Sequence, residues 1–382
     1  MNLKKDIETI LVRGASLGDS RTGAMSFPIY QSATFKHPGL NMTTGYDYSR
    51  ANNPTREELE KTIALLEGGN DALAFSSGVS AIASCISIFS SGDHFILSED
   101  LYGGTYRLFE ETFKNFGIKC DFVDTSDREK IKRYIKKSTK AIFVETPSNP
   151  LMRVSDIKAI SEIAKENGLI LIVDNTFLTP YFQKPLSLGA DIVVHSGTKF
   201  LGGHNDLLAG LVIVKDELLS DRFRKVQMAT GSILSPFDSW LLLRSLKTLH
   251  IRMERCEKNA IEIANYLKEF DSVLEVFYVG LKESKGYEIN KKQSTGFGAM
   301  ISFKVKDEKL VEKILNGLEV ISFAESLGGT ESLITYPFTQ THADMPSLYK
   351  EKLGIDNRLL RLSVGIENIN DLKEDLRKVL EV

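Results

Sequence analysis

An amine, a carboxylate and two hydroxyls follow two short apolar runs in the middle of the chain. Asp174 comes directly after the first run, and Ser196, Thr198 and Lys199 come just after the second. An amine can form an imine with an aldehyde, a carboxylate can keep a pyridine nitrogen protonated, and hydroxyls can donate to a phosphate. These are the groups that are needed to hold pyridoxal phosphate.

The two apolar runs indicate how these groups are positioned. Residues 169–173 and 191–194 are short, continuous and rich in β-branched side chains, which is typical of strands buried on both faces in a parallel sheet. In an open sheet of this kind, ligands bind beyond the carboxyl ends of the strands. We therefore expect Asp174 and Lys199 to meet at one edge of the sheet, with the two hydroxyls beside them.

A candidate phosphate site lies earlier in the chain, at the turn Ser77-Gly78-Val79. This turn connects a predicted strand over 71–75 to a predicted apolar helix over 79–89. The first N–H groups of a helix have no partner within the helix, so they bind anions readily. We expect Ser77, Gly78 and Val79 to hold the phosphate of the cofactor.

From residue 57 the chain alternates between predicted strands and predicted helices, which favours an α/β fold with a mostly parallel sheet. Residues 1–56 contain many turn formers but also several aromatic side chains, which indicates an arm packed on another surface. Residues 57–240 are expected to form the large, cofactor-binding domain. A helical pattern over 236–270 is expected to link it to a smaller α+β domain, so that 241–382 hold the linking helix and the C-terminal domain.

The overall composition excludes several classes of protein. The 382 residues are 42% hydrophobic and 26% charged, with a net charge of −3, so no charge excess favours nucleic acid or an anionic membrane. The basic helix predicted over 127–137 has apolar residues at helical spacing, which indicates an ordinary solvated helix. No apolar run reaches the ~18 residues of a membrane span, and the N-terminus has no apolar core of a signal peptide. Cys85, Cys120 and Cys256 form no CxxC pair, so we expect a cytoplasmic protein without a metal site.

Two blocks of sequence resemble a known family. Asp174-Asn175-Thr176 and Ser196-Gly197-Thr198-Lys199, the latter followed by Gly202-Gly203, resemble the trans-sulfuration (Cys/Met metabolism) enzymes, which are PLP-dependent proteins of fold-type I. The likeness covers nearly the whole chain and points to bacterial cystathionine γ-synthases and O-acylhomoserine thiolyases. It implies an aspartate-aminotransferase-like fold, with pyridoxal 5′-phosphate held as an imine on Lys199. It also implies a homotetramer, a dimer of dimers whose active sites are each shared between two chains.

The resemblance implies roles for residues elsewhere in the chain. Tyr48 and Arg50 match a Y-x-R segment that reaches the cofactor phosphate of the partner chain, so residues 1–56 are expected to contact the neighbouring subunit. Tyr102 matches a tyrosine that stacks on the pyridine ring and assists proton transfer. Four further residues match the site for the amino-acid substrate: Asn149, Glu325, Ser326 and Arg361. The guanidinium of Arg361 is expected to grip the α-carboxylate through a bidentate pair.

The same resemblance favours one reaction over its neighbours. Glu325 lies where cystathionine γ-synthases and γ-lyases carry an acidic residue, and with Asp47 it is expected to pair with an ammonium group of a sulfur amino acid. Gly104 stands where methionine γ-lyases carry cysteine, which argues against that activity. We therefore expect γ-replacement on an O-acylhomoserine, which gives cystathionine or homocysteine. The alternative is a cystathionine β-lyase or γ-lyase.

Other classes of protein fit the sequence less well. A nucleotide-binding dehydrogenase is also doubly wound, but it needs a GxGxxG or GxxxxGK[ST] loop, and neither motif is present. A protein without catalytic activity is disfavoured by the combination of Asp174, Lys199 and Arg361. We interpret His195, close to the lysine, as a satisfied structural histidine and not as an acid–base group.

Overall fold

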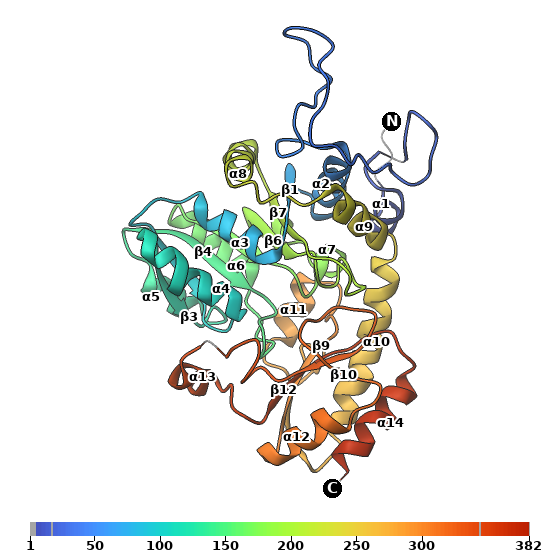
Figure 1. Ribbon diagram of the computed structural model, residues 1–382. Helices are drawn as coiled ribbons and strands as arrows, with labels where there is room; N and C mark the ends of the chain where they lie inside the picture. Colours follow the sequence, from blue (N-terminus) through green and yellow to red (C-terminus); the bar gives the residue numbers. More distant parts are fainter. Residues whose placement is uncertain (1–4, 17, 344, 382) are drawn as a thin grey trace.

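The computed structural model describes residues 5–16, 18–343 and 345–381, and within them the chain forms two sheets (Figure 1). The larger sheet has the order β1-β7-β6-β5-β4-β2-β3. Strands β2 to β6 are parallel, whereas β7 is antiparallel to both of its neighbours, β1 and β6. The strands are β1 (Asp71–Phe75), β2 (His94–Ser98), β3 (Lys119–Val123), β4 (Thr139–Glu145), β5 (Ile170–Asp174), β6 (Ile192–Ser196) and β7 (Gly210–Val214).

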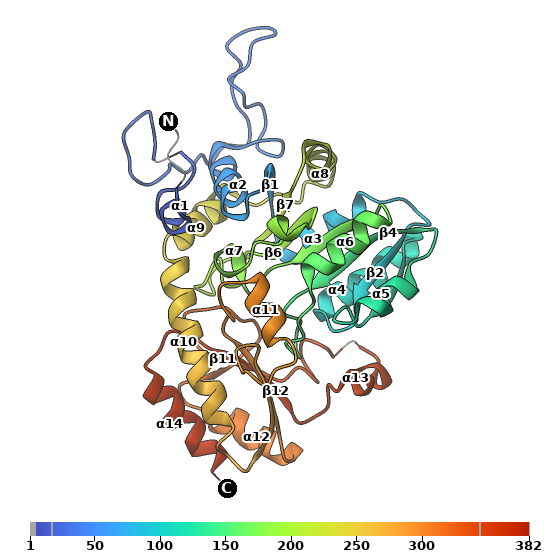
Figure 2. The same ribbon diagram turned by 180° about the vertical axis from the view of Figure 1, so that it is seen from behind.

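The central strands are buried on both faces, as their continuous apolar runs predict. In β5, Leu171 and Val173 belong to one core cluster, and Ile172 between them belongs to the other. Helices therefore pack on both sides of the sheet (Figures 1 and 2). One face is covered by α2 (Pro54–Glu67), α6 (Ile157–Glu166) and α7 (Thr179–Phe182), and the other by α3 (Gly78–Ser87) and α8 (Glu217–Thr230).

The smaller sheet lies in the C-terminal part of the chain and has the order β10-β11-β12-β9-β8. Its helices α10, α12 and α14 contribute buried side chains to the same core cluster as β9 and β12. This arrangement agrees with the expected α/β fold, a mostly parallel large sheet with a smaller α+β part. The strands are β8 (Val273–Phe277), β9 (Met300–Val305), β10 (Ser322–Phe323), β11 (Leu333–Thr335) and β12 (Leu359–Ser363), and the helices include α12 (Glu308–Gly317) and α14 (Ile369–Leu380).

The helical pattern over 236–270 is two helices and not one. Helix α9 (Pro236–Leu246) ends near the large sheet, and α10 (Leu249–Leu267) runs from there to α14 (Figure 1). The carbonyl of Ser245 accepts hydrogen bonds from the side chains of Thr248, at 3.3 Å, and Arg252, at 3.0 Å. The backbone N–H of Thr248 donates to the same carbonyl at 3.2 Å, a bond over three residues that closes the last turn of α9 where the helix ends.

Other elements differ from the expected pattern. The helical segment between β2 and β3 is split into α4 (Gly103–Arg107), a π-helical turn (Leu108–Thr112) and a 3₁₀ turn (Phe113–Phe116). Strand β8 was not expected, because its exposed Leu274 and Glu275 break the alternation of an edge strand. The remaining helices are α1 (Ile7–Arg13), α5 (Arg128–Tyr134), a 3₁₀ turn (Pro185–Leu188), α11 (Tyr287–Gln293) and α13 (Ser347–Leu353).

The segment between α1 and α2 projects away from both sheets (Figures 1 and 2). It is held at its base, where Asn53 donates to the carbonyl of Tyr30 at 2.9 Å and Tyr30 donates to Thr55 at 2.9 Å. Several large apolar side chains of the segment are exposed: Met25, Ile29, Leu40, Met42 and Tyr48. In the described part of the chain, no helix is both long enough and apolar enough to cross a bilayer.

Candidate active site

A cavity of about 190 Å³ opens at the carboxyl ends of β4, β5 and β6. All the residues that were predicted as site residues line it, except Asp47, Tyr48 and Arg50 of the N-terminal segment. The predicted residues in its wall are Ser77, Gly78, Val79, Tyr102, Asn149, Asp174, Ser196, Thr198, Lys199, Glu325, Ser326 and Arg361. Residues that were not predicted complete the wall: Ile82, Glu145, Pro147, Thr176, Phe177, Leu208, Leu327 and Thr341.

Asp174 occupies the end of β5, and Thr176 fixes its carboxylate. The Oδ1 atom of Asp174 accepts from the N–H of Thr176 at 3.0 Å and from its hydroxyl at 2.5 Å. The same hydroxyl accepts from the N–H of Ser196 at 2.9 Å, and this joins the ends of β5 and β6. Burial raises the pKa of Asp174 above its ordinary value, and the hydrogen bonds from Thr176 oppose that shift.

Lys199 follows β6 and extends into the cavity. Its Nζ atom donates to the hydroxyl of Ser326 at 2.8 Å. Burial lowers the pKa of Lys199 to about 8, and nearby Arg361 adds to the shift while Glu325 opposes it. A lysine with a lowered pKa is neutral in a larger fraction of molecules near pH 7, so its amine is a better nucleophile and base.

The turn that carries Lys199 is held from behind by Arg252 of α10. The guanidinium is 6% exposed and donates to the carbonyls of Phe200, at 2.6 Å, and Leu201, at 3.4 Å. Gly203 in this turn has φ +70°, and a Cβ atom there would overlap the guanidinium. The glycine therefore allows both the turn and the close approach of the arginine. Arg252 was not predicted as a site residue, because its contacts with this turn join segments that lie far apart in the sequence.

The start of α3 provides donors for an anion. Ser77 caps the helix by accepting from the N–H of Ser80 at 3.1 Å, and the N–H groups of Gly78 and Val79 have no acceptor in the described chain. A Cβ on Gly78 would lie 2.8 Å from the Cβ of Ser196, so the glycine keeps this corner open.

Thr198, a predicted phosphate donor, also bonds to the protein backbone. Its hydroxyl accepts from the N–H of Ala209 at 3.0 Å and donates to the carbonyl of the same residue at 3.3 Å. This pair of bonds ties the lysine turn to the segment before β7. Its role toward a phosphate stays a prediction.

Arg361 lies on β12 and reaches the cavity from the smaller sheet. It is 2% exposed and donates to Asn149 at 2.8 Å, to the carbonyl of Ser326 at 3.0 Å and to Thr335 at 3.2 Å. Its Nε atom is buried without a partner in the described chain. Burial lowers the pKa of Arg361 to about 10, which still leaves it charged near pH 7, and nearby Glu145 opposes the shift.

Tyr102 precedes α4 and is 36% exposed. Its backbone N–H donates to Oε2 of Glu145 at 2.9 Å. A Cβ atom on Gly104 would overlap the ring of Tyr102, so the glycine gives the ring its space. The sequence pattern also indicated Glu145 as a site residue, because Glu145 ends a buried strand as Asp174 does. From that segment only Asn149 was predicted to line the site.

Tyr48 and Arg50 do not reach the cavity of their own chain. Arg50 donates to the carbonyl of Met228 at 3.0 Å, and its guanidinium carbon lies 5.6 Å from the ring centroid of Tyr48, which is 49% exposed. Their action at a partner's site stays a prediction. His195 lies outside the cavity wall as well, and its Nε2 atom contacts Glu67 at 2.6 Å, with both side chains fully buried.

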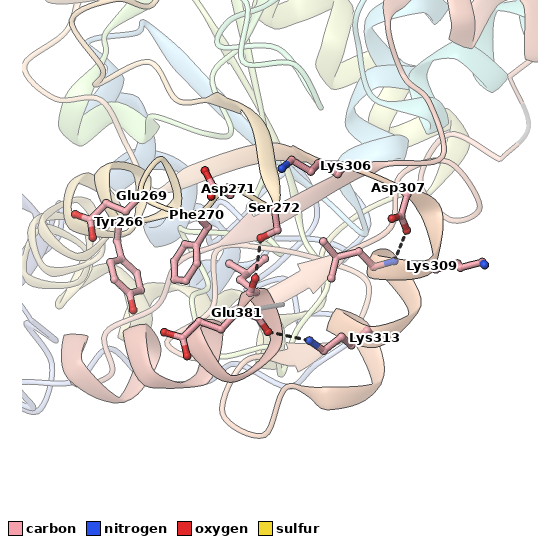
Figure 3. A pocket seen from close by; sticks show the side chains of 12 residues that line it. Tyr266, Glu269, Phe270, Asp271, Ser272, Lys306, Asp307, Lys309, Lys313 and Glu381 are labelled. Carbon is pink, nitrogen blue, oxygen red and sulfur yellow. Dashed lines mark hydrogen bonds between the residues drawn. The ribbon is translucent and has the colours of Figure 1, made fainter.

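A larger hollow of about 800 Å³ lies at the far end of the smaller sheet, between the ends of α10, α12 and α14 (Figure 3). Two hydrogen bonds join groups in its wall: Ser272 donates to the carbonyl of Leu380 at 2.8 Å, and Lys313 donates to that of Glu381 at 3.1 Å. None of the predicted site residues lines it, so the catalytic candidates remain in the smaller cavity.

Comparisons with known proteins identify the family of the chain. Residues 8–381 match the family model described as Cys/Met metabolism PLP-dependent enzyme. A cystathionine gamma-synthase/O-acetylhomoserine (thiol)-lyase of Bacillus subtilis is 50% identical over 378 residues, covering 99% of this chain and 97% of the relative. A cystathionine beta-lyase of Lactococcus lactis is 49% identical over 375 residues, covering 98% and 99%. The crystal structure of cystathionine gamma-lyase from Lactobacillus plantarum complexed with L-serine has a TM-score of 0.97, with 44% identity and 99% of both chains covered.

Proposed function

The chain belongs to the Cys/Met metabolism PLP-dependent enzyme family, and from that premise we propose that it catalyses γ-replacement on an O-acylhomoserine. Its relatives place it among the trans-sulfuration enzymes, although their names divide between synthases and lyases. Pyridoxal phosphate, when bound, supplies a ring that withdraws electrons from the carbon next to the substrate nitrogen. The observation that carries the proposal is the meeting of Lys199, Asp174 and Arg361 in one cavity.

The residues present fit this cofactor. The unpaired N–H groups at the start of α3 lie in the cavity wall with Ser196, where a phosphate needs donors. Asp174 offers a buried carboxylate for the pyridine nitrogen, and both hydrogen bonds from Thr176 fall on Oδ1. The amine of Lys199, with its pKa of about 8, suits a covalent link to the aldehyde. We therefore propose Lys199 as the residue that carries the cofactor.

We propose Lys199 as the acid–base group once its amine is free. A leaving group at Cγ requires proton removal from Cα and then from Cβ, and a pKa of about 8 lets the amine accept and return protons near neutral pH. Tyr102, which also lines the cavity, is proposed to stack on the pyridine ring and to assist these transfers. The hydroxyl of Ser326, which accepts from Nζ at 2.8 Å, is proposed to hold the amine once it is free of the cofactor.

Arg361 is proposed to bind the α-carboxylate of the substrate. Arg361 lines the cavity and its Nε atom has no partner in the described chain, so the guanidinium keeps a donor that a carboxylate can accept from. Ser326, whose backbone is strained at φ +96°, contacts the same guanidinium through its carbonyl. Together these residues orient the Cα–H bond toward Lys199.

Two residues support the choice of substrate. Glu325 lines the cavity with Lys199 and Arg361, so its carboxylate is available to the ammonium group of a second amino acid such as cysteine. A side chain at position 104 would displace the ring of Tyr102, so Gly104 leaves room for that ring. The glycine also distinguishes this site from that of methionine γ-lyases, which carry cysteine at this position. Asp47, proposed to assist Glu325, lies on the projecting arm and could act only in a neighbouring chain's site, as proposed for Tyr48 and Arg50.

A panel of substrates tests this proposal. We expect O-acetyl- or O-succinylhomoserine with cysteine to give cystathionine faster than the purified enzyme cleaves cystathionine, cysteine or methionine alone. Sulfide in place of cysteine separates cystathionine formation from homocysteine formation. Faster cleavage of cystathionine favours the lyase alternative, and the position of cleavage then distinguishes the β-lyase from the γ-lyase. The lyase names among the relatives make that alternative the second candidate.

A further inference from the structure

The carboxyl groups of Glu145 and Asp174 end two neighbouring parallel strands at the same level. Glu145 is the last residue of β4, and it pairs in register with Asp174, the last residue of β5. Paired residues of neighbouring strands point to the same face of a sheet, and both side chains line the cavity. The two residues are 6% and 8% exposed. Asp174 has a proposed role, whereas Glu145 has none so far.

The hydrogen bonds to the two carboxyl groups differ. Asp174 accepts two, from the N–H and the hydroxyl of Thr176, at 3.0 and 2.5 Å. Glu145 accepts one, from the N–H of Tyr102 at 2.9 Å. Donors to a carboxylate stabilise its charged form, so the negative charge is better supported on Asp174 than on Glu145.

The charged groups that act on Glu145 come from three other elements. Asp174 on β5 and Asp100, between β2 and α4, are acidic, whereas Arg361 on β12 is basic. Two neighbouring carboxyl groups away from water ionise together only at high cost, because like charges repel strongly in a low dielectric. Burial, with Asp174 adding to it, raises the pKa of Glu145 well above its ordinary value, and Arg361 opposes the shift.

We propose that Glu145 is a positioning residue that keeps its proton in the working enzyme, holding Tyr102 at the cavity wall while Asp174 carries the negative charge of the pair. A neutral carboxyl group still has an oxygen that can accept the N–H of Tyr102, so the hydrogen bond does not require ionisation. This inference rests on the proposed role of Asp174 at the pyridine nitrogen.

Glu145 provides a buried acceptor for the backbone of Tyr102, whose side chain is partly exposed. Tyr102 precedes a short helix, and its N–H to Glu145 fixes the backbone from which the ring projects. The ring in turn lies where a side chain on Gly104 would be. Without the acceptor on β4, the N–H of Tyr102 loses its partner and the start of α4 is free to shift.

The test compares Glu145→Gln, which keeps a neutral acceptor, with Glu145→Leu, which removes it. Three quantities are measured on the full-length protein: the dissociation constant of added pyridoxal phosphate, the pH midpoint of the visible absorbance of the bound cofactor, and kcat and KM with the best substrate of the panel. We expect Glu145→Leu to weaken cofactor binding and lower kcat by ~10-fold or more, and Glu145→Gln to restore most of both. The absorbance midpoint of Glu145→Gln should move by less than ~0.5 unit, since no charge is removed.

Two results overturn the inference. If the midpoint of Glu145→Gln moves by more than ~1 unit, Glu145 is ionised in the enzyme. If Glu145→Leu folds and matches the wild type, Glu145 does not position Tyr102. Should Glu145→Leu fail to fold, the midpoint of Glu145→Gln still decides the charge. Asp174→Asn separates failure of the proposed function from failure of this inference. If that variant retains its affinity for the cofactor, the role of Asp174 is removed, and this inference with it. If the variant loses that affinity and the midpoint of Glu145→Gln moves by more than ~1 unit, the inference alone is overturned.

Discussion

The Nζ atom of Lys199 donates to the hydroxyl of Ser326 at 2.8 Å, across 127 positions of the chain. Ser326 has φ +96°, a conformation that costs energy for any residue with a side chain, and its carbonyl accepts from Arg361 at 3.0 Å. One strained residue between β10 and β11 therefore contacts both the amine and the guanidinium of the site. The smaller sheet supplies this residue, and the larger sheet supplies the lysine.

Lys199→Ala is expected to abolish both covalent attachment of the cofactor and turnover, because no other amine lines the cavity among the described residues. The purified wild type should absorb near ~420 nm, and the variant should lose that band even when pyridoxal phosphate is added. Lys215→Ala, an exposed lysine just after β7, serves as the control. A variant at position 199 with normal turnover would remove the proposed role.

The pH dependence of cofactor attachment follows from the lowered pKa of Lys199. The neutral amine attacks an aldehyde and the ammonium form does not, so the rate at which cofactor-free protein gains visible absorbance should rise with pH and level off above about 8. An ordinary lysine reaches that plateau about two units higher. Stopped-flow absorbance, with N-acetyl-lysine as the reference amine, measures both curves. Identical midpoints would contradict the environment described for Lys199.

Arg361→Ala is expected to raise KM for the amino-acid substrate by ~10- to 100-fold, the range of one lost charge-assisted pair. The visible absorbance of the bound cofactor should remain, because the guanidinium is proposed to bind the substrate and not the cofactor. Arg358→Ala provides a matched control, since Arg358 precedes the same strand but pairs with Asp356 near the surface. Steady-state kinetics and absorbance spectra check the two effects separately. An unchanged KM would exclude Arg361 from carboxylate binding.

Arg252→Met is expected to lower the free energy of unfolding by about 1–3 kcal/mol, because the carbonyls of Phe200 and Leu201 lose a buried donor. It should also slow cofactor attachment, since the turn that carries Lys199 is no longer held. Arg255→Met on the same helix is the control, as Arg255 donates only a 3.3 Å bond to the carbonyl of Glu367 near the surface. Urea unfolding and the absorbance assay measure the two quantities. Equal effects of both variants would show that Arg252 does not support the turn that carries Lys199.

Sharing of sites between chains predicts complementation. A chain with Tyr48→Phe and Arg50→Ala and a chain with Lys199→Ala should each be inactive or weak alone. Mixed oligomers should regain about a quarter to a half of wild-type activity, because one site of a pair then has both intact halves. Purification through two different affinity tags, one on each variant, removes the oligomers that contain only one kind of chain. Inactivity of the mixed oligomers would show that Tyr48 and Arg50 serve no neighbouring site.

The sheet edge that carries Asp174 and Lys199 could be predicted because it depends on short-range patterns. Residues 170–174 and 192–196 are β-strands in the structure, close to the predicted 169–173 and 191–194. A run buried on both faces has the same signature wherever it occurs, and parallel strands bring their carboxyl ends to one edge. This is why Asp174 and Lys199 line one cavity as expected. The antiparallel β7 left no comparable signal, since it is an apolar run like its neighbours.

Contacts between distant segments could not be read from local patterns. Arg252 meets the carbonyl of Phe200 across 52 positions, and Arg361 meets Asn149 across 212. A buried arginine has the same local signature whether it supports a turn or binds a substrate. Glu145 became a site residue when the register of β4 against β5 placed it beside Asp174.

Motifs and periodicity were therefore enough to establish the family resemblance, the α/β architecture and the amine and carboxylate at the sheet edge, because each depends on neighbours a few residues away. Three features depend instead on packing between segments far apart in sequence. They are the groups that surround that amine, the carboxyl group that is better placed to keep its proton, and the position of Tyr48 and Arg50 outside their own chain's cavity. Burial and charge at such contacts arise when the chain folds, so they belong to the tertiary structure.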